Sequence, residues 1–368
     1  MRIVQCVTLA SSDGAFGGPL SVAMQQCREL ARLGHHVTLL AGWDGELQLE
    51  VPGTRVILAR ARRIAGAGFS GIYAPQLSRW LRRNRASVDI VHVHLGRHLV
   101  DLTVAKTAQD LGLPVVVQTH GMVMPDSRPA VNLLDGVLTR RVLRRAEAVL
   151  TLSEEETAGV RQVQPAATIR PVQNGVAPVE RERKSAVGDH EVLFLSRLHP
   201  RKRVMAFAEA SLQIVTRHPS ARFSVVGPDE GDLDQLNKFM ARHSELPMRY
   251  EGSVPPGEGS RRIAEADVFV LPSVGEVFPM ALLEALAAGT PVVMNADCAI
   301  APALERTGAA LVTDGTPGAL ASAVARLLED PSLRASMQAA GRKMVEGEFG
   351  SRAVALDLEN LYQSAPGT

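Results

Sequence analysis

Short apolar runs rich in β-branched residues alternate with amphipathic stretches along the whole chain. In the first half the apolar runs predict strands at 3–9, 36–41, 55–59, 89–94, 114–119, 148–152 and 168–172. The stretches between them predict helices at 19–33, 74–85, 99–111 and 133–146. The second half predicts strands at 192–196, 222–226, 248–251, 268–271, 291–294 and 310–312 and helices at 204–216, 232–243, 280–288 and 318–328. Apolar strands that alternate with helices are typical of parallel sheets covered on both faces, so the pattern predicts an α/β protein with two doubly wound, Rossmann-like domains.

A polar stretch between Asn174 and Glu191 interrupts this alternation. It carries turn residues and charges without apolar periodicity, so we place the interdomain linker there. The predicted domains are 1–176 and 177–349. Two doubly wound domains joined in this way are expected to face each other across a cleft, and ligands of such folds bind outside the carboxyl ends of the strands. Residues that directly follow strands are therefore the first candidates for function.

The charge of the chain is balanced overall but uneven between its halves. The 368 residues carry a net charge of +1, which argues against a nucleic-acid partner. Residues 1–178 have a net charge of +6 and the remainder −5. A basic first half and an acidic second half suggest that the two domains meet different partners.

The cysteines and the first ten residues indicate the cellular compartment in which the protein is expected. The three cysteines are odd in number and far apart, which argues against a disulfide framework or a zinc ribbon and fits a reducing compartment. The apolar run at 3–10 is short, contains Gln5 and Thr8, and predicts a strand rather than a signal peptide. No window reaches the roughly 18 apolar residues of a spanning helix. We therefore expect a cytoplasmic protein.

Two acidic residues follow the strand predicted at 268–271. Glu276 and Glu284 are eight residues apart, a spacing that lets two carboxylates bind hydroxyls at opposite ends of one extended ligand. The helix start at Pro279 and Met280 offers free N–H groups and a positive dipole end, which suit a phosphate. The alternative is a solvated Glu276 and a Glu284 that only closes an ion pair. We favour function, because Glu284 stands among apolar residues, where a carboxylate without a partner is costly.

A cluster of basic residues follows the first strand of the second domain. Arg197 ends that strand, and Lys202 falls near the start of the next helix. A guanidinium and an ammonium beside a helix N-terminus can hold a diphosphate. The alternative is a solvated basic face, an interpretation that we favour for Arg201 and Arg203.

Several glycine-containing turns also follow strands. Gly17 and Gly18 stand between the first strand and the first helix, where backbone can approach a ligand closely. Gly227 follows the strand at 222–226, and Ser253 and Val254 follow the strand at 248–251; these main-chain groups could hold a base or phosphate, or form plain turns. The dinucleotide fingerprint G-x-G-x-x-G is absent, which argues against a nicotinamide dehydrogenase.

Histidines gather near two strand ends. His120 comes between a buried strand and a glycine, so we expect it to project into the cleft as a hydrogen-bond donor. His94 ends another strand, and His92 shares its face. A metal site built on these three residues is the alternative, but no acidic or cysteine ligand is spaced to complete one. We therefore predict no metal.

The order G-G … H-G … N-G … S-R-L-x3-K … G-S-V … E-x7-E … G-x-P-V-V resembles the GT-B glycosyltransferases of family 4, over nearly the whole chain. The resemblance implies a nucleotide-diphosphate sugar donor (UDP- or GDP-linked), retention of the anomeric configuration, and neither a metal nor a separate cofactor. It implies a catalytic set of His120, Glu276, Arg197 and Lys202. It implies donor-binding residues at Gly17, Gly18, Arg197, Lys202, Gly227, Ser253, Val254, Glu276, Phe278, Pro279, Met280 and Glu284.

The resemblance also assigns roles within that set. Arg197 and Lys202 would bind the diphosphate, Glu284 the ribose and Glu276 the donor sugar, with His120 near the reacting carbon. The final helix, within about 350–368, would pack back on the first domain. Similar proteins usually have glycine where this chain has Pro279 and Arg203.

The acceptor is expected to be a hydroxyl of a saccharide or lipid-linked glycan, in bacterial cell-envelope or exopolysaccharide synthesis. Two arginine clusters in the basic first domain suit an anionic membrane surface or a pyrophosphate-linked lipid, or are ordinary solvated faces; they comprise Arg79, Arg82, Arg83 and Arg85, and Arg140, Arg141, Arg144 and Arg145. The alternatives to a transferase are a nucleotide-sugar epimerase on the same fold and a non-catalytic two-domain sugar-binding protein.

Overall fold

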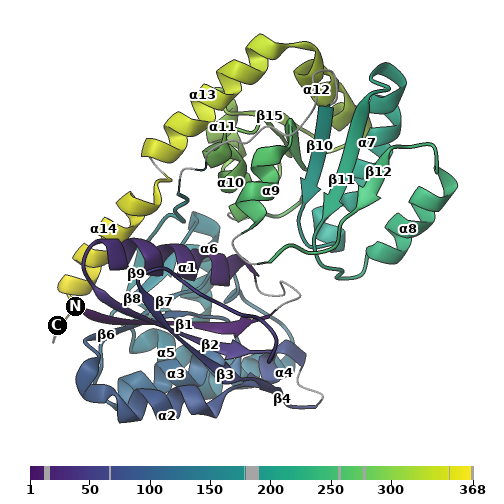
Figure 1. Cartoon of the computed structure of the whole chain (residues 1–368). Helices are drawn as coiled ribbons and strands as arrows, with labels where there is room; N and C mark the ends of the chain where they lie inside the picture. Colours follow the sequence, from purple (N-terminus) through teal and green to yellow (C-terminus); the bar gives the residue numbers. More distant parts are fainter. Residues whose placement is uncertain are drawn as a thin grey trace. The chain divides into compact units, whose positions relative to one another are not determined.

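Two parallel sheets, each in its own unit, organise the chain (Figure 1). The computed structural model describes residues 1–11, 17–65, 68–177, 179, 190–255, 258–276, 279–347 and 349–365. Unit 1 comprises Met1–Gly175 and Ser351–Thr368, and unit 2 comprises Val176–Gly350. The stretch that we predict as a linker falls mostly at 178 and 180–189, outside the described residues.

Unit 1 is built on a seven-stranded parallel sheet with the order β3-β2-β1-β6-β7-β8-β9. Its strands are β1 (Arg2–Ala10), β2 (His36–Trp43), β3 (Thr54–Arg60), β6 (Ile90–His94), β7 (Val115–Gln118), β8 (Ala148–Thr151) and β9 (Ile169–Pro171). A short antiparallel pair, β4 (Arg62–Arg63) and β5 (Ile72–Tyr73), lies outside this sheet. The strand order reverses between β1 and β6, which makes their carboxyl ends the topological switch point of unit 1.

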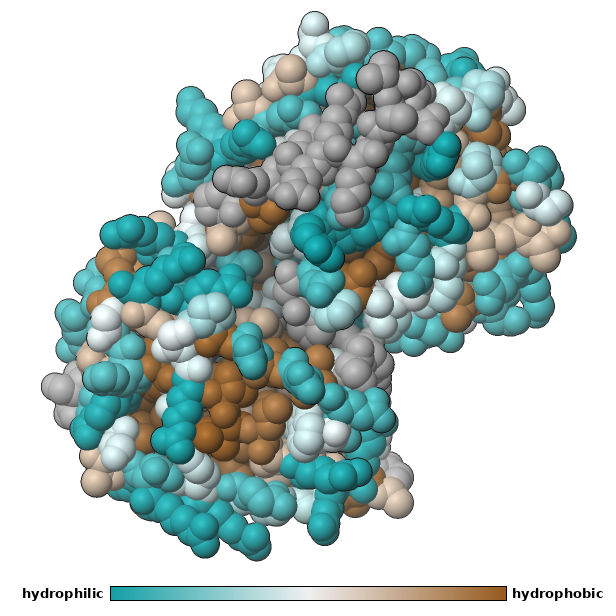
Figure 2. All heavy atoms as spheres, viewed as in Figure 1, coloured by the Kyte–Doolittle hydropathy of each residue, from teal (hydrophilic) through white to brown (hydrophobic). Residues whose placement is uncertain are grey.

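Helices cover both faces of this sheet. One face packs against α2 (Pro75–Arg83), α3 (Leu99–Asp110), α5 (Arg140–Arg144) and α6 (Glu154–Val163). The other packs against α1 (Gly17–Arg32) and the C-terminal helix α14 (Ser351–Gln363), which also contact each other. Short 3-10 segments lie at Gly68–Gly71 and Arg85–Ser87. In the view of Figure 2, hydrophobic side chains gather over the strands of unit 1, within a hydrophilic surround.

The helix predicted at 133–146 differs from the structure. It begins earlier, as α4 (Pro129–Leu134), because a proline suits the first helical position. A π-helical turn, η3 (Asp135–Thr139), then separates α4 from α5. Asp135 is 3% exposed and its carboxylate accepts two hydrogen bonds of 2.8 Å from the Arg97 guanidinium. The π-helical turn η3 thus contains one partner of a buried ion pair, which the spacing of apolar residues in the sequence does not reveal.

Unit 2 has a six-stranded parallel sheet with the order β12-β11-β10-β13-β14-β15. Its strands are β10 (His190–Leu195), β11 (Ala221–Val226), β12 (Met248–Tyr250), β13 (Val268–Leu271), β14 (Val292–Asn295) and β15 (Ala310–Thr313). One face packs against α7 (Val204–Arg217), α8 (Leu233–Arg242) and α12 (Pro317–Glu329), and the other against α9 (Gly259–Glu265), α10 (Met280–Ala288), α11 (Ala301–Thr307) and α13 (Pro331–Gly347). The order reverses between β10 and β13, so the switch point of unit 2 lies at their carboxyl ends.

The predicted fold class is confirmed. Every strand expected from an apolar run is present in one of two parallel sheets, and helices cover both faces of each. The structure adds helices that we did not expect: α6, α9, α11 and α13. Within the described residues, the structure contains no helix with the length and hydrophobicity that a membrane crossing requires. Cys6, Cys27 and Cys298 are buried, free thiols.

Candidate functional site

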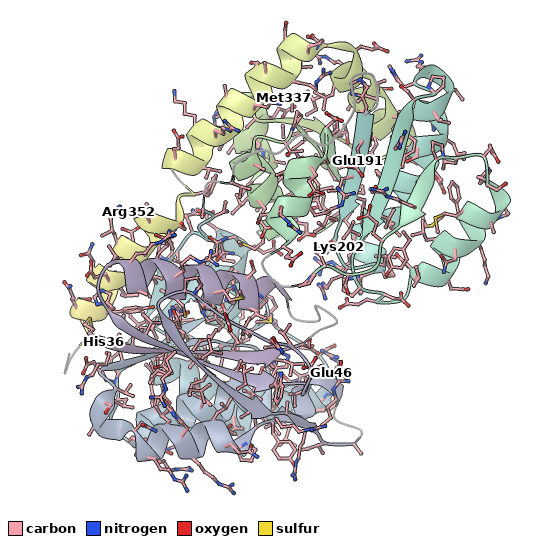
Figure 3. The ribbon with its side chains drawn as sticks, in the orientation of Figure 1. His36, Glu46, Glu191, Lys202, Met337 and Arg352 are labelled. Atoms are coloured by element: carbon pink, nitrogen blue, oxygen red, sulfur yellow. The ribbon has the colours of Figure 1, made fainter. Side chains whose placement is uncertain are left out.

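The switch point of unit 2 brings together two residues that are far apart in the sequence. Lys202 ends a short 3-10 turn, η4 (Pro200–Lys202), just after β10, and lies past the carboxyl end of that strand in Figure 3. Glu276 follows the neighbouring strand β13. The Lys202 ammonium forms an ion pair with Glu276 Oε1, and both side chains are about 15% exposed, at 15% and 14%. A mostly buried cation and anion therefore meet where parallel sheets usually bind ligands.

Arg197 lies at the same strand end but is more exposed. Its guanidinium donates to both carboxylate oxygens of Glu230, at 2.9 and 2.8 Å, and its side chain is 48% exposed. Such an exposed pair is weak, because solvent screens it. Arg197 is thus held in place by a carboxylate that a stronger anion can displace.

The neighbouring loop is fixed by a residue for which we expected no role. Arg201 donates to the main-chain oxygens of Val274 and Gly275, and Gly275 N–H donates to Asp297 at 3.0 Å. Arg201 therefore anchors the loop that leads to Glu276, so it is more than a solvated cation.

Glu284 lies inside α10 and is 9% exposed. Its Oε2 lies near Gly259 at the start of α9, where a Cβ would come within 3.3 Å of that oxygen. The same Cβ position is 4.0 Å from Leu195, the last residue of β10. The Glu284 carboxylate therefore also lies near the switch point. Pro279 is the N-cap of α10 and Met280 is its first residue; Phe278 lies outside the described residues.

The main-chain candidates differ in whether their N–H and C=O groups remain free to bind a ligand. Gly227 has a φ of +143°, and a Cβ there would come 1.9 Å from the Ser196 carbonyl oxygen, so the glycine is required by a close approach of backbone. Its N–H already donates to the Gly252 carbonyl at 2.8 Å, and its carbonyl accepts from the Tyr250 hydroxyl at 2.8 Å. Only the second lone pair of that carbonyl remains for a ligand.

The other main-chain candidates lie at element ends. Ser253 is exposed after β12, whereas Val254 packs partly against the core of unit 2. In unit 1, Gly17 is the first residue of α1, and Gly18 is exposed with open space at its Cβ position. The residues that lead into this helix, 12–16, lie outside the described residues.

His120 lies in unit 1, just past the end of β7. Its φ of +51° is unusual for a residue other than glycine, and such strain is common at functional sites. The residue as a whole is half-buried, and its Nε2 is 2.8 Å from His94 Nδ1. Burial lowers the pKa of His120 to about 3, so the ring is neutral at physiological pH.

Sequence reasoning missed a buried carboxylate that fixes the turn around His120. Glu156, in the first turn of α6, is fully buried. Its Oε1 accepts from the Thr119 hydroxyl at 2.5 Å and from Gly121 N–H, and its Oε2 accepts from Leu152 N–H at 2.7 Å. Glu154 and Glu155 beside it are exposed, and nothing in the run of three acidic residues marks the third as buried, so only tertiary structure reveals that Glu156 points inward.

A second missed cluster occupies the switch point of unit 1. Asp101 is fully buried, and its Oδ2 accepts from the Thr8 hydroxyl at 2.6 Å and from Gly96 N–H at 3.0 Å. The same oxygen is 3.2 Å from His98 Nδ1. In the sequence, the only signal for it was Thr8, one of two polar residues, with Gln5, in the apolar strand at 3–10.

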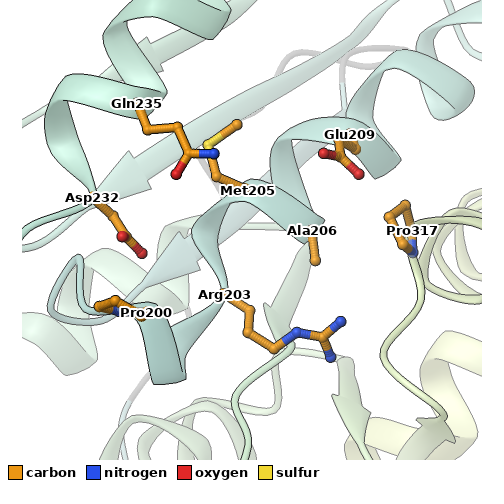
Figure 4. Close-up of a pocket in the computed structure, with 8 residues that line it drawn as sticks. All are labelled: Pro200, Arg203, Met205, Ala206, Glu209, Asp232, Gln235 and Pro317. Carbon is orange, nitrogen blue, oxygen red and sulfur yellow. The ribbon is translucent and has the colours of Figure 1, made fainter.

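A hollow of about 320 Å³ adjoins η4 on unit 2 (Figure 4). It is lined by Pro200, Arg203, Met205, Ala206, Glu209, Asp232, Gln235 and Pro317. None of the predicted site residues lines it. Across the described part of the chain, no three or more His, Cys, Asp or Glu side chains are grouped so that they could hold a metal ion.

Comparison with known proteins places both halves of the chain in one family. Residues 16–180 match the model of Glycosyltransferase Family 4, and residues 189–330 match that of the Glycosyl transferases group 1. The chain is 24% identical over 396 residues to D-inositol 3-phosphate glycosyltransferase of Corynebacterium jeikeium, covering 96% of this chain and 93% of that protein. It is 30% identical over 179 residues to a GDP-mannose-dependent monoacylated alpha-(1-6)-phosphatidylinositol monomannoside mannosyltransferase of Corynebacterium glutamicum. That match spans 46% of each protein, about half its length.

Among solved structures, Anabaena HepE in complex with UDP and glucose superposes with a TM-score of 0.75 at 18% identity, covering 98% of this chain and 99% of that one. This likeness concerns the fold, which is of the GT-B type. The chain is a glycosyltransferase with the GT-B fold and belongs to glycosyltransferase family 4.

Proposed function

We propose that this chain transfers a hexosyl unit from a UDP- or GDP-linked sugar to a hydroxyl of a saccharide or lipid-linked acceptor, with retention and without a metal ion. The observation that carries the proposal is the Lys202–Glu276 ion pair at the switch point of unit 2. Donor chemistry of this kind is supported by the printed names of a relative that depends on GDP-mannose and of a structural neighbour bound to UDP and glucose.

The cations at this point are suited to a diphosphate. Lys202 and Arg197 are each paired with a carboxylate, Glu276 and Glu230 respectively. A diphosphate carries more charge than a single carboxylate and would compete for both cations. Its binding would release Glu276 to accept hydrogen bonds from hydroxyls of the donor sugar. The two cations would then stabilise the charge that develops on the leaving diphosphate.

The nucleoside end of the donor is assigned to Glu284. Its carboxylate lies near the end of β10, and a carboxylate can accept hydrogen bonds from two neighbouring ribose hydroxyls. We assign His120 to the donor sugar near the reacting carbon. The acceptor proton passes to the leaving phosphate on the same face of the sugar, because among the described residues we identify no carboxylate placed as a nucleophile.

For the acceptor we propose a lipid-linked glycan or saccharide of the bacterial cell envelope. The printed name of the Corynebacterium glutamicum relative includes a phosphatidylinositol mannoside, which supports a lipid-linked acceptor. On unit 1, Leu133 and Val137 are 69% and 61% exposed and one helical turn apart, next to the exposed Arg140 and Arg144. Exposed apolar side chains beside arginines suit an anionic membrane surface.

The alternatives make different demands. A nucleotide-sugar epimerase needs acid and base groups on both sides of one sugar carbon, and a sugar-binding protein needs no diphosphate site. A site for a diphosphate at Lys202 would favour a nucleotide-sugar enzyme over a sugar-binding protein, and the match to the glycosyltransferase family models favours transfer over epimerisation.

The decisive test combines binding with turnover. We expect UDP- or GDP-sugars to raise the midpoint of thermal unfolding, because a ligand at 100 times its Kd adds about 2.7 kcal/mol of stability. Lys202→Ala should reduce that shift to about a third or less and lower kcat/KM at least about 30-fold, which corresponds to about 2 kcal/mol. Lys238→Ala, which removes an exposed ion-paired lysine from the same unit, is the matched control.

The reaction details follow from the same assay. Nucleotide release that requires an acceptor, a product with the donor's anomeric configuration and full activity in EDTA support the proposal. An epimerised donor, or binding without turnover in every acceptor mixture, would contradict it. Binding that responds to anionic lipid and salt only when Arg140 and Arg144 are present would support the membrane assignment.

A further inference from the structure

The backbone around His120 is fixed from two sides. Glu156 holds both neighbours of His120, accepting from the Thr119 hydroxyl and the Gly121 N–H. A left-handed conformation at a residue with a side chain costs on the order of 1–3 kcal/mol, so it persists only where the surroundings impose it. The position of the His120 ring is therefore built into unit 1.

The ring itself joins a column of imidazoles. His92 and His94, on one face of β6, have ring centres 4.9 Å apart and planes 9° apart. The His94 and His120 rings are 5.0 Å and 15° apart. Because burial lowers the pKa of all three, to about 3 for His92 and His120, each ring is neutral and carries one N–H.

A relay of buried amides determines where the His94 proton lies. Gln5 Nε2 donates to Gln26 Oε1 at 3.1 Å, Gln26 Nε2 to Gln118 Oε1 at 3.0 Å, and Gln118 Nε2 to Asn174 Oδ1 at 3.0 Å. All four side chains are at most 4% exposed. The remaining Gln5 oxygen faces His94 Nε2 at 3.0 Å, so in this arrangement of the amides that nitrogen carries the proton. To reverse it, all four amides would have to flip together.

The proton on His120 then follows. With its N–H on Nε2, His94 has a bare Nδ1, which can only accept a hydrogen bond. His120 Nε2 is 2.8 Å away and must donate to it. His120 Nδ1 is therefore bare as well. Among the described residues, no other hydrogen bond reaches the His120 ring, and the residue as a whole is partly exposed.

We propose that His94 and Gln5 are positioning residues that hold His120 as its Nε2–H tautomer, so that His120 offers Nδ1 to substrate as a hydrogen-bond acceptor. The group that it meets must then be a donor, such as a sugar hydroxyl, and not a carbonyl or carboxylate. This specificity role rests on the proposed function, which brings substrate to His120. It reverses the expectation that His120 is a hydrogen-bond donor to the substrate.

The tautomer can be observed without any substrate. In full-length protein labelled with ¹⁵N-histidine, long-range ¹H–¹⁵N correlations distinguish protonated from bare ring nitrogens. We expect His120 to show Nε2 protonated and Nδ1 bare, unchanged from pH 6 to 9. A proton on Nδ1, an exchange average of both forms, or titration within that range would overturn the proposal.

Variants test the relay. Gln5→Met removes the acceptor for the His94 N–H, so we expect a mixture of His120 tautomers and a kcat about three- to tenfold lower, the effect of one hydrogen bond. Gln109→Met is the matched control, because Gln109 is a buried glutamine of unit 1 that bonds to Val142 instead. A single His120 tautomer and unchanged kcat in Gln5→Met would exclude the relay.

A second variant and the wild-type spectrum test the His120 tautomer even if Gln5→Met does not fold or no turnover is found. If Gln5→Met does not fold, Gln118→Met interrupts the relay at another amide, and the wild-type spectrum alone still decides the tautomer. If no donor and acceptor support turnover, the proposed function fails. The spectra still show whether His94 and Gln5 fix the His120 proton.

Discussion

Lowering the pH from 7.5 to 5.5 is expected to destabilise unit 1, because buried histidines must stay neutral in the folded state. His92 is fully buried and His94 is 1% exposed. Burial lowers the pKa of His92 to about 3, and burial together with the neighbouring rings lowers that of His94 well below its usual value. In the unfolded chain both titrate near pH 6.5, so unfolding takes up protons below that pH. The stabilisation is complete above pH 6.5 and is lost as the pH falls toward 3.

The size of this loss follows from how far a histidine is protonated in the folded and in the unfolded state. At pH 5.5 about nine-tenths of an unfolded histidine is protonated, whereas the buried ring remains neutral. Each such residue then costs about 1.4 kcal/mol of unfolding free energy relative to pH 7.5. His92, His94 and His120, whose pKa burial also lowers to about 3, together cost about 4 kcal/mol. Carboxylates with lowered pKa, such as Asp126 at about 2, contribute little in this range because they titrate at lower pH.

Urea denaturation followed by tryptophan fluorescence measures this loss in unit 1 alone, because both tryptophans of the chain, Trp43 and Trp80, belong to it. His92→Gln should reduce the loss of unfolding free energy between pH 7.5 and 5.5 by about 1.4 kcal/mol. This difference does not depend on how much the substitution itself destabilises the protein at pH 7.5. His36→Gln, at an exposed site, should leave the loss unchanged. A wild-type stability that changes by less than about 0.5 kcal/mol, or equal losses in all three proteins, would refute the reasoning.

Three further predictions concern unit 2 and are measured by urea denaturation followed by circular dichroism. Against the opposing effect of burial, hydrogen bonds from Arg262 and Arg249 lower the pKa of Glu251 to about 2; between pH 5 and 3 unit 2 should therefore lose about 1 kcal/mol after solvent screening, and Arg262→Met, which costs about 2 kcal/mol at pH 7, should reduce that loss. Gly227→Ala should cost at least about 2 kcal/mol more than Gly231→Ala, because both glycines have positive φ but only the first lacks room for a Cβ; equal costs would contradict the steric argument. Arg203 has a φ of +57°, so Arg203→Gly should raise the unfolding free energy by up to about 1 kcal/mol and Arg203→Val should lower it by about as much; identical effects would show that the backbone is not strained.

The sequence was sufficient for the elements of both sheets and for part of the site. Lys202 and Glu276 each follow a strand, and those strands, β10 and β13, are neighbours at the reversal of strand order. Their encounter is therefore a consequence of the topology that the apolar pattern predicts. The partner of Arg197 was not predictable in this way, because Glu230 lies in a loop after β11 whose course depends on the close approach at Gly227.

The polar layer of unit 1 shows where sequence reasoning stops. Spacing places His92 and His94 on one face of β6, and a polar Gln5 inside an apolar strand already indicates a buried partner. Which residues meet depends on register: Gln5 pairs with His92 across β1 and β6, and His94 with Gln118 across β6 and β7. In parallel sheets register is set by crossover helices rather than by short turns, so it leaves no local mark in the sequence. Hydrogen bonding among buried polar groups then selects one arrangement, because any other register leaves several of them without partners.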